Sequence, residues 1–133
     1  MPADRSPGVT GRVDARSELG RRGEQAAARW YVARGYEVLA RNWRCAAGEI
    51  DLVCARSERG RGRIACTLVV CEVKARTSAS HGHPLEAVTP AKQRRLRRLA
   101  AAFLHSQGRC FDHVRFDVVA VTGLSLEVVE SAF

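Results

Sequence analysis

Two apolar stretches with charged residues embedded in them constrain this chain more than any other part of its sequence. They span residues 48–53 and 68–74, and their Val, Ile, Leu and Cys content is typical of β-strands. Side chains alternate between the faces of a strand, so Glu72 and Lys74 share a face, while Asp51 stands between apolar neighbours. Because a charge inside an apolar strand is costly unless it is paired or binds a metal, these three residues predict a site.

The chemistry that suits this set is metal-assisted cleavage of a phosphodiester. Asp51 and Glu72 supply the hard oxygen ligands that Mg²⁺ or Mn²⁺ prefers, and such an ion activates water and polarises a phosphate. Lys74 would hold the attacking water or offset charge on the phosphate. The alternative is a strand pair with an ordinary salt bridge, because a Glu-x-Lys tripeptide alone is weak evidence.

Several short motifs resemble those of a known family. They are Gly20-Arg21-Arg22-Gly23-Glu24-Gln25-Ala26-Ala27, Gly35-Tyr36-Glu37-Val38-Leu39-Ala40-Arg41-Asn42-Trp43-Arg44, Gly48-Glu49-Ile50-Asp51, Val70-Cys71-Glu72-Val73-Lys74-Ala75-Arg76 and Arg115-Phe116-Asp117-Val118-Val119. Together they resemble the PD-(D/E)XK restriction-endonuclease-like superfamily. More closely, they resemble its YraN-like family of small bacterial proteins, which are similar to archaeal Holliday-junction resolvases. The resemblance covers residues 17–130, and the chain departs from the superfamily signature where Ile50 replaces the proline.

The resemblance implies further site residues and a partner. A glutamate on the first helix completes the acidic cluster in similar proteins, a role that falls on Glu24; otherwise Glu24 is a solvated residue paired with Arg21. Lys92 matches a lysine that recurs in the family. A resolvase-like protein is also expected to be a homodimer that acts on branched or junction DNA.

Residues 89–107 predict an amphipathic helix with a basic surface. Thr89 caps it, Pro90 occupies its first turn, and the buried stripe comprises Leu96, Leu99, Ala100 and Phe103. Its outer residues either contact DNA phosphates or form a solvated face. The candidate nucleic-acid-binding residues are Lys92, Arg94, Arg95 and Arg98.

Length, charge and cysteine content limit the class of protein. A chain of 133 residues predicts one domain, residues 17–133, after a flexible tail, residues 1–16. The net charge of +8 favours a polyanionic partner, although many basic proteins have none. Five cysteines without a Cys-x-x-Cys pair argue against zinc and disulfides, and we expect a cytoplasmic protein with no membrane span or signal peptide.

The predicted order is a helix over residues 17–34, three strands, the helix over 89–107 and two strands. This order predicts an α/β domain with a restriction-endonuclease-like core, in which helices flank a central mixed β-sheet. Residues 56–63 are expected to form a polar hairpin loop, and Asp117 to be a structural acid paired with Arg115 or a loop amide. The first hypothesis is a Mg²⁺-dependent DNA endonuclease. The alternatives are a non-catalytic nucleic-acid-binding or assembly protein with the same fold and, third, a zinc protein.

Overall fold

We describe the protein from a computed structural model, which covers residues 7–77 and 82–133, with residues 7–17 described as backbone alone. The elements in chain order are α1 (Pro7–Ala33), β1 (Glu37–Cys45), β2 (Gly48–Gly60), β3 (Arg63–Arg76), the 3₁₀ helix η3 (Pro84–Ala87), α2 (Pro90–Ser106), β4 (His113–Thr122) and β5 (Ser125–Val129). The predicted order of helices and strands is confirmed. No helix in the described ranges has the length and apolar composition that a membrane span requires.

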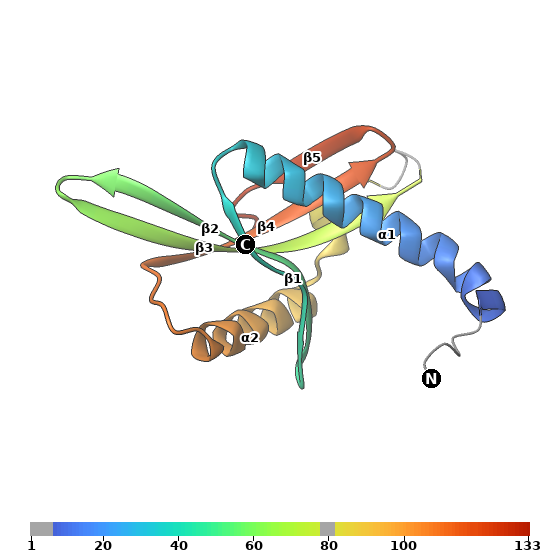
Figure 1. Ribbon diagram of the computed structural model, residues 1–133, viewed down its shortest axis with the longest axis horizontal. Coiled ribbons are helices and arrows are strands. Elements are labelled where there is room, and N and C mark those ends of the chain that lie inside the picture. Colours follow the sequence, from blue (N-terminus) through green and yellow to red (C-terminus); the bar gives the residue numbers. More distant parts are fainter. Residues whose placement is uncertain (1–6, 78–81) are drawn as a thin grey trace.

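The strands form one mixed sheet in the order β1-β2-β3-β4-β5. Strands β3 and β4 are parallel and the other neighbours are antiparallel. A parallel pair needs a long crossover, and α2 provides it, whereas short turns join the antiparallel strands. Helix α1 lies on one face of the sheet and α2 on the other (Figure 1). The prediction of an α/β domain whose mixed sheet is flanked by helices is therefore confirmed.

Each face of the sheet carries its own apolar core. Ile50, Leu68 and Val70 pack against the buried stripe of α2, which consists of the predicted Leu96, Leu99, Ala100 and Phe103. On the opposite face the core beneath α1 consists of Ala27, Ala28, Tyr31, Tyr36, Leu52, Cys54, Val69, Cys71, Val119 and Val121. The sheet is therefore the central layer, and polar residues inside its strands are tolerated only where they find partners.

The first helix is longer than the sequence predicts. The expected start at Ser17 is wrong, because α1 begins at Pro7 and ends close to the predicted position, before Gly35, whose φ is +88°. Part of the segment expected to be a flexible tail is thus helical, while residues 1–6 lie outside the described residues. The sequence prediction failed because Pro7 and Gly8 are residues typical of turns, whereas proline is also tolerated in the first turn of a helix.

The predicted hairpin loop over residues 56–63 is also wrong in extent. The ladder between β2 and β3 continues to the pair Gly60↔Arg63, so only Arg61 and Gly62 form the turn. Both turn residues have positive φ, 37° and 81°, as the tight turn that suits the twist of a β-hairpin requires. Both faces of this ribbon are exposed, so its residues are mostly polar on both faces. A strand in which apolar and polar residues do not alternate cannot be distinguished from a loop in the sequence.

Candidate functional site

Three polar residues lie side by side where the ladder between β2 and β3 stops. The register places Asn42 opposite Asp51, between the pairs Arg41↔Leu52 and Trp43↔Ile50. The last pair of β2 with β3 is Leu52↔Cys71, so one further step along both strands brings Asp51 beside Glu72. The two predicted acidic residues therefore come together through strand pairing.

The side chain of Asp51 accepts a hydrogen bond from the backbone of β3 at this point. Its Oδ2 accepts the amide proton of Val73 at 2.8 Å, which leaves Oδ1 as the oxygen not engaged by that amide. Burial and then the neighbouring Glu72 carboxylate raise the pKa of Asp51 from 3.8 to about 7, although the Val73 amide opposes this shift. The carboxylate is thus held in a place that favours its neutral form until a cation compensates its charge.

Glu72 is held by two lysines from different elements. Its Oε2 lies 3.5 Å from Nζ of Lys74 on the same strand and 3.4 Å from Nζ of Lys92 on α2. The Glu72 side chain is only 14% exposed, so both ammonium groups act on a carboxylate with little access to water. Burial, followed by the nearby Lys74, lowers the pKa of Lys92, and these effects outweigh the attraction of Glu72. The pair of lysines leaves one positive charge in excess over Glu72.

Capping of α2 places Lys92 at this position. The Thr89 hydroxyl accepts the backbone amide of Lys92 at 3.3 Å, as expected of an N-cap residue. The first turn of α2 therefore lies beside the acidic site, and a helix amino terminus favours anions. A phosphate beside Lys92 would experience the helix end and the ammonium group together.

Glu24 reaches the border of the site from α1. Its Oε1 accepts a hydrogen bond from Asn42 Nδ2 at 3.1 Å, and its charge contributes to the raised pKa of Asp51. Burial is also the largest cause that raises the pKa of Glu24 itself. The helix comes this close because residue 23 is glycine: a Cβ there would lie 2.9 Å from the Ala75 Cβ. An open hollow of about 430 Å³ adjoins Glu24, lined also by Gly20, Arg21, Asn42 and Arg44.

The carboxylates of Asp51 and Glu72 are suitable ligands for a hard divalent cation, although they are only two. Asp51 and Glu72 offer carboxylate oxygens, which Mg²⁺ and Mn²⁺ prefer, and Mg²⁺ commonly keeps several waters. Within the described ranges, His, Cys, Asp and Glu side chains form no group of three that could hold a metal ion. The site therefore offers two protein carboxylates at most in this arrangement, with Glu24 turned to Asn42.

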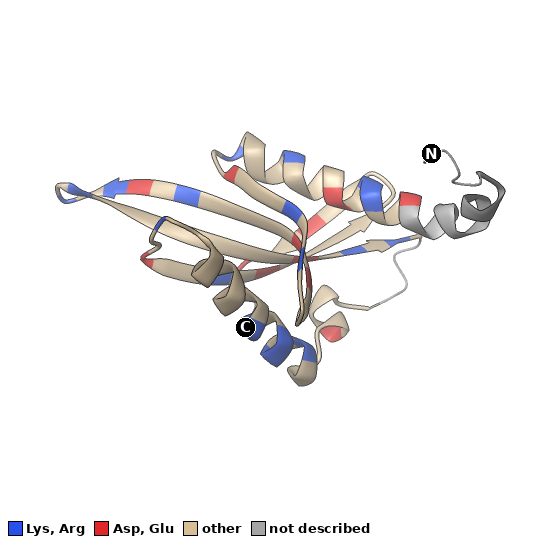
Figure 2. Cartoon of the chain, turned by 60° about the horizontal axis from the view of Figure 1, so that its bottom comes forward, with Lys and Arg blue, Asp and Glu red and all other residues tan. Residues whose placement is uncertain are grey.

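The candidate nucleic-acid-binding residues divide into two groups. Lys92 is half-buried and belongs to the acidic site, whereas Arg94, Arg95 and Arg98 lie outside the buried stripe that α2 packs against the sheet. Figure 2 shows the basic positions of α2 gathered at one end of the helix, which is its amino-terminal half. The arginines therefore form a surface next to the site, and the lysine is part of the site itself.

Sequence reasoning did not place Asn42 in the site. It occupies a strand position with φ of +50°, which few residues other than glycine adopt, and asparagine is one of them. Its side-chain amide donates to Glu24 in this conformation. An asparagine amid the apolar and basic residues of a predicted strand is the one signal that could have indicated it.

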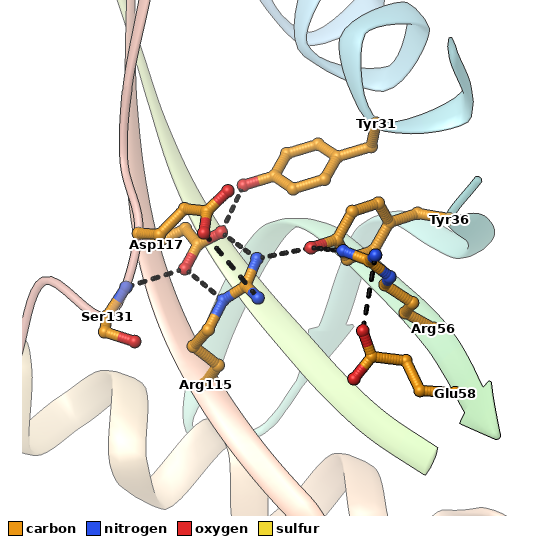
Figure 3. A network of polar contacts seen from close by, with 8 residues as sticks. Tyr31, Tyr36, Arg56, Glu58, Arg115, Asp117 and Ser131 are labelled. Atoms are coloured by element: carbon orange, nitrogen blue, oxygen red, sulfur yellow. Dashed lines mark hydrogen bonds and ion pairs between the residues drawn. The ribbon is translucent and has the colours of Figure 1, made fainter. Parts of the chain in front are cut away.

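Asp117 is a structural acid, as predicted. Figure 3 shows its carboxylate between Tyr31 of α1 and Arg115 of β4. It accepts the Tyr31 hydroxyl at 2.6 Å, Arg115 Nε and Nη2 at 2.9 and 2.8 Å, and the Ser131 amide at 3.1 Å. Arg115 continues the network to the Tyr36 hydroxyl at 2.9 Å. Since these partners satisfy a fully buried charge, the network fixes α1 on the sheet and is separate from the acidic site.

Comparison with known proteins gives consistent matches. The family model described as "Uncharacterised protein family UPF0102" matches residues 23–121. A UPF0102 protein of Acidothermus cellulolyticus is 44% identical over 140 residues, covering 94% of this chain and all of the relative. Another, of Beutenbergia cavernae, is 50% identical over 107 residues, covering 80% and 84% of the two chains. One of Prosthecochloris aestuarii is 44% identical over 114 residues, covering 83% and 80%.

Proposed function

The chain belongs to the UPF0102 family, and from the geometry of its acidic site we propose that it is a metal-dependent endonuclease that cleaves DNA. The observation that carries the proposal is the meeting of Asp51 and Glu72 from adjacent strands, with Lys74 and Lys92 beside Glu72. This arrangement agrees with the resemblance of the sequence to the PD-(D/E)XK superfamily, with its YraN-like members and archaeal junction resolvases.

Asp51 and Glu72 are the residues that would hold Mg²⁺ or Mn²⁺. Asp51 would use Oδ1, because Oδ2 is engaged by the Val73 amide. When bound, such an ion polarises a phosphodiester oxygen and lowers the pKa of a coordinated water. The raised pKa of Asp51 supports this role, since a nearby cation is what stabilises the ionised form of a buried carboxylate.

The lysines supply the remaining charge stabilisation. Lys74 lies on the same strand face as Glu72, where its ammonium group can donate a hydrogen bond to an attacking water. Lys92, at the amino-terminal end of α2, can donate to a phosphate oxygen on which negative charge develops. Glu24, held by Asn42, would accept a proton or orient water from the α1 side.

DNA is the proposed substrate because basic residues lie next to the acidic site. Arg94, Arg95 and Arg98 present guanidinium groups on α2 outside its buried stripe, and such groups bind phosphates. The proposal extends to a cytoplasmic homodimer that cuts two strands of branched DNA, as the resolvase resemblance implies. Sedimentation would measure the dimer, and competition by an unbranched duplex would test the preference for branches.

Cleavage of labelled duplex, single-stranded, forked and four-way DNA with Mg²⁺ or Mn²⁺ tests the nuclease. Wild-type protein should cut at least one of these, and Asp51→Asn and Lys74→Ala should lose roughly a hundredfold or more in rate. Glu49→Gln is the matched control, because Glu49 is an exposed carboxylate next to the site, 3.6 Å from Arg44. It should cut at close to the wild-type rate. Equal cutting by Asp51→Asn would contradict the proposal.

A second candidate is a nucleic-acid-binding or assembly protein that retains the fold without catalysis. The observation in its favour is that two lysines already neutralise Glu72, and no third acidic or imidazole ligand joins the carboxylates within the described ranges. Calorimetric titration with Mn²⁺ separates the two. Metal binding that is lost in Asp51→Asn supports the nuclease, whereas salt-sensitive DNA binding without metal binding or cleavage supports the second candidate.

A further inference from the structure

The hairpin formed by the ends of β2 and β3 extends past both helices (Figure 1). Residues 57–64 are all exposed, so neither face of this ribbon contributes to a core. It is nevertheless regular, with the pairs Arg59↔Ile64 and Gly60↔Arg63 adjoining a two-residue turn. A two-stranded ribbon gains little stability by itself, so a contact with another molecule is a reason for a chain to keep one.

The tip of the hairpin has an excess of positive charge. Two acidic residues neutralise cations near it: Glu58 lies 3.3 Å from Arg56, and Asp112 lies 2.9 Å from Arg63. Arg59 and Arg61 form no ion pair with any described residue and are exposed. Their charges are therefore available to an anionic partner, beside an open hollow of about 610 Å³ that residues 59–64 line.

We propose that residues 59–64 form an arm that binds the phosphate backbone of duplex DNA along the major groove. This inference rests on the proposed function, which makes DNA the partner. The major groove, about 12 Å wide, admits a two-stranded β-ribbon, and arginines at its tip reach the phosphates on either side. Residues 59–63 are arginines and glycines and the turn is only two residues long, so Ile64, which is 58% exposed, is the one large apolar side chain that the arm brings to the groove.

The distance from the tip to the acidic site matches a repeat of the duplex. Strand β3 runs without interruption from Arg63 to Glu72, which at ~3.3 Å per residue is roughly 30 Å. One turn of B-DNA is ~34 Å, so the arm would meet the duplex about one turn from the phosphodiester at the site. Ile64 and Glu72 are an even number of positions apart on β3, so the alternation of side chains places both on the same face of the strand.

Binding measurements without divalent metal test the arm independently of cleavage. The double variant Arg59→Gln/Arg61→Gln should bind a labelled duplex roughly tenfold more weakly or worse, and the slope of log K against log salt should fall by about two. The matched control is Arg22→Gln/Arg29→Gln, which removes the same charge from exposed positions of α1. It should keep the wild-type slope. Melting temperatures should be unchanged in both double variants, since all four residues are exposed.

A shortened hairpin gives a second readout. Replacement of residues 58–65 by Asn-Gly joins Ser57 to Cys66, which are paired in the ladder, through a favoured two-residue turn. The change removes three residue pairs of the ladder, about 10 Å at ~3.3 Å per residue. The DNA segment that this variant protects from a chemical footprinting reagent should therefore shorten by at least about three base pairs, at ~3.4 Å each.

Three results would overturn the arm. The first is a wild-type slope and affinity in Arg59→Gln/Arg61→Gln while Asp51→Asn loses cleavage, which leaves the nuclease intact. The second is an equal loss in the α1 control, which would mean that total charge alone matters. The third is that wild-type protein binds no DNA and the hairpin variants alter the molecular mass measured by sedimentation. That result would mean that the hairpin contacts another protein chain.

Discussion

Replacing the Asp51 carboxylate by an amide should stabilise the metal-free protein, although it should slow cleavage roughly a hundredfold or more. The side-chain amide introduced by Asp51→Asn would still offer an oxygen to the Val73 backbone amide, which Asp51 Oδ2 contacts at 2.8 Å. The variant removes only the ionised form, which burial and Glu72 disfavour. Removal of a catalytic group is commonly stabilising where the site is held in an unfavourable electrostatic state.

The magnitude follows from the pKa of Asp51. A rise from 3.8 to about 7 corresponds to at most about 4 kcal/mol, because each pH unit is worth ~1.4 kcal/mol. Asp51 keeps some contact with water, which screens its interaction with Glu72, so we expect about 1–3 kcal/mol. In a chain of this size that gain raises the melting temperature by roughly 4–12 °C.

The pH dependence has a definite sign. Because the pKa of Asp51 is higher in the folded protein, folding takes up a proton between pH 3.8 and about 7. The free energy of unfolding of the wild type therefore falls as pH rises through this range, relative to that of Asp51→Asn. The difference between the two proteins should be smallest near pH 4 and constant above about pH 7.

Urea denaturation from pH 4 to pH 8 in a chelating buffer measures this difference. Glu49→Gln is the control, because Glu49 is exposed and its replacement should change stability by less than about 0.5 kcal/mol. Addition of Mg²⁺ or Mn²⁺ should stabilise the wild type more than Asp51→Asn, since an ion that binds only the folded state shifts the equilibrium by mass action. Equal stability of the two proteins at every pH would refute the reasoning.

Three further predictions concern packing, the buried network and the second lysine. Gly23→Ala should lower stability by about 1–3 kcal/mol in urea denaturation, because its Cβ would lie 2.9 Å from the Ala75 Cβ, and Ala75→Gly should restore most of the loss. Asp117→Asn should lower the free energy of unfolding by about 3 kcal/mol in the same assay, since it leaves buried donors without a charged acceptor. Tyr31→Phe should lower it by only about 1 kcal/mol, and an equal loss in the two variants would contradict this order. Lys92→Gln should reduce cleavage roughly tenfold to a hundredfold with an unchanged melting temperature, and unchanged cleavage would remove Lys92 from the site.

Much of the fold could be predicted from the sequence because its signals are local. The helix that begins after Thr89 combines a cap, a proline in the first turn and an apolar stripe, and each acts within a few residues. The strands that carry Asp51 and Glu72 are apolar enough to be recognised, and the charges inside them indicated the site. The full length of the hairpin was missed for the converse reason: strands exposed on both faces lack the alternation that distinguishes a strand from a loop.

The sequence by itself determined the type and order of the elements and the chemical character of the acidic residues. Only the tertiary structure decided which partners these residues meet. Lys92 approaches Glu72 because α2 crosses the sheet at that point, and Tyr31 reaches Asp117 from a helix 86 positions earlier in the chain. Periodicity and capping depend on neighbours along the chain, whereas an ion pair between elements depends on how their apolar faces pack, and packing is a property of the whole core.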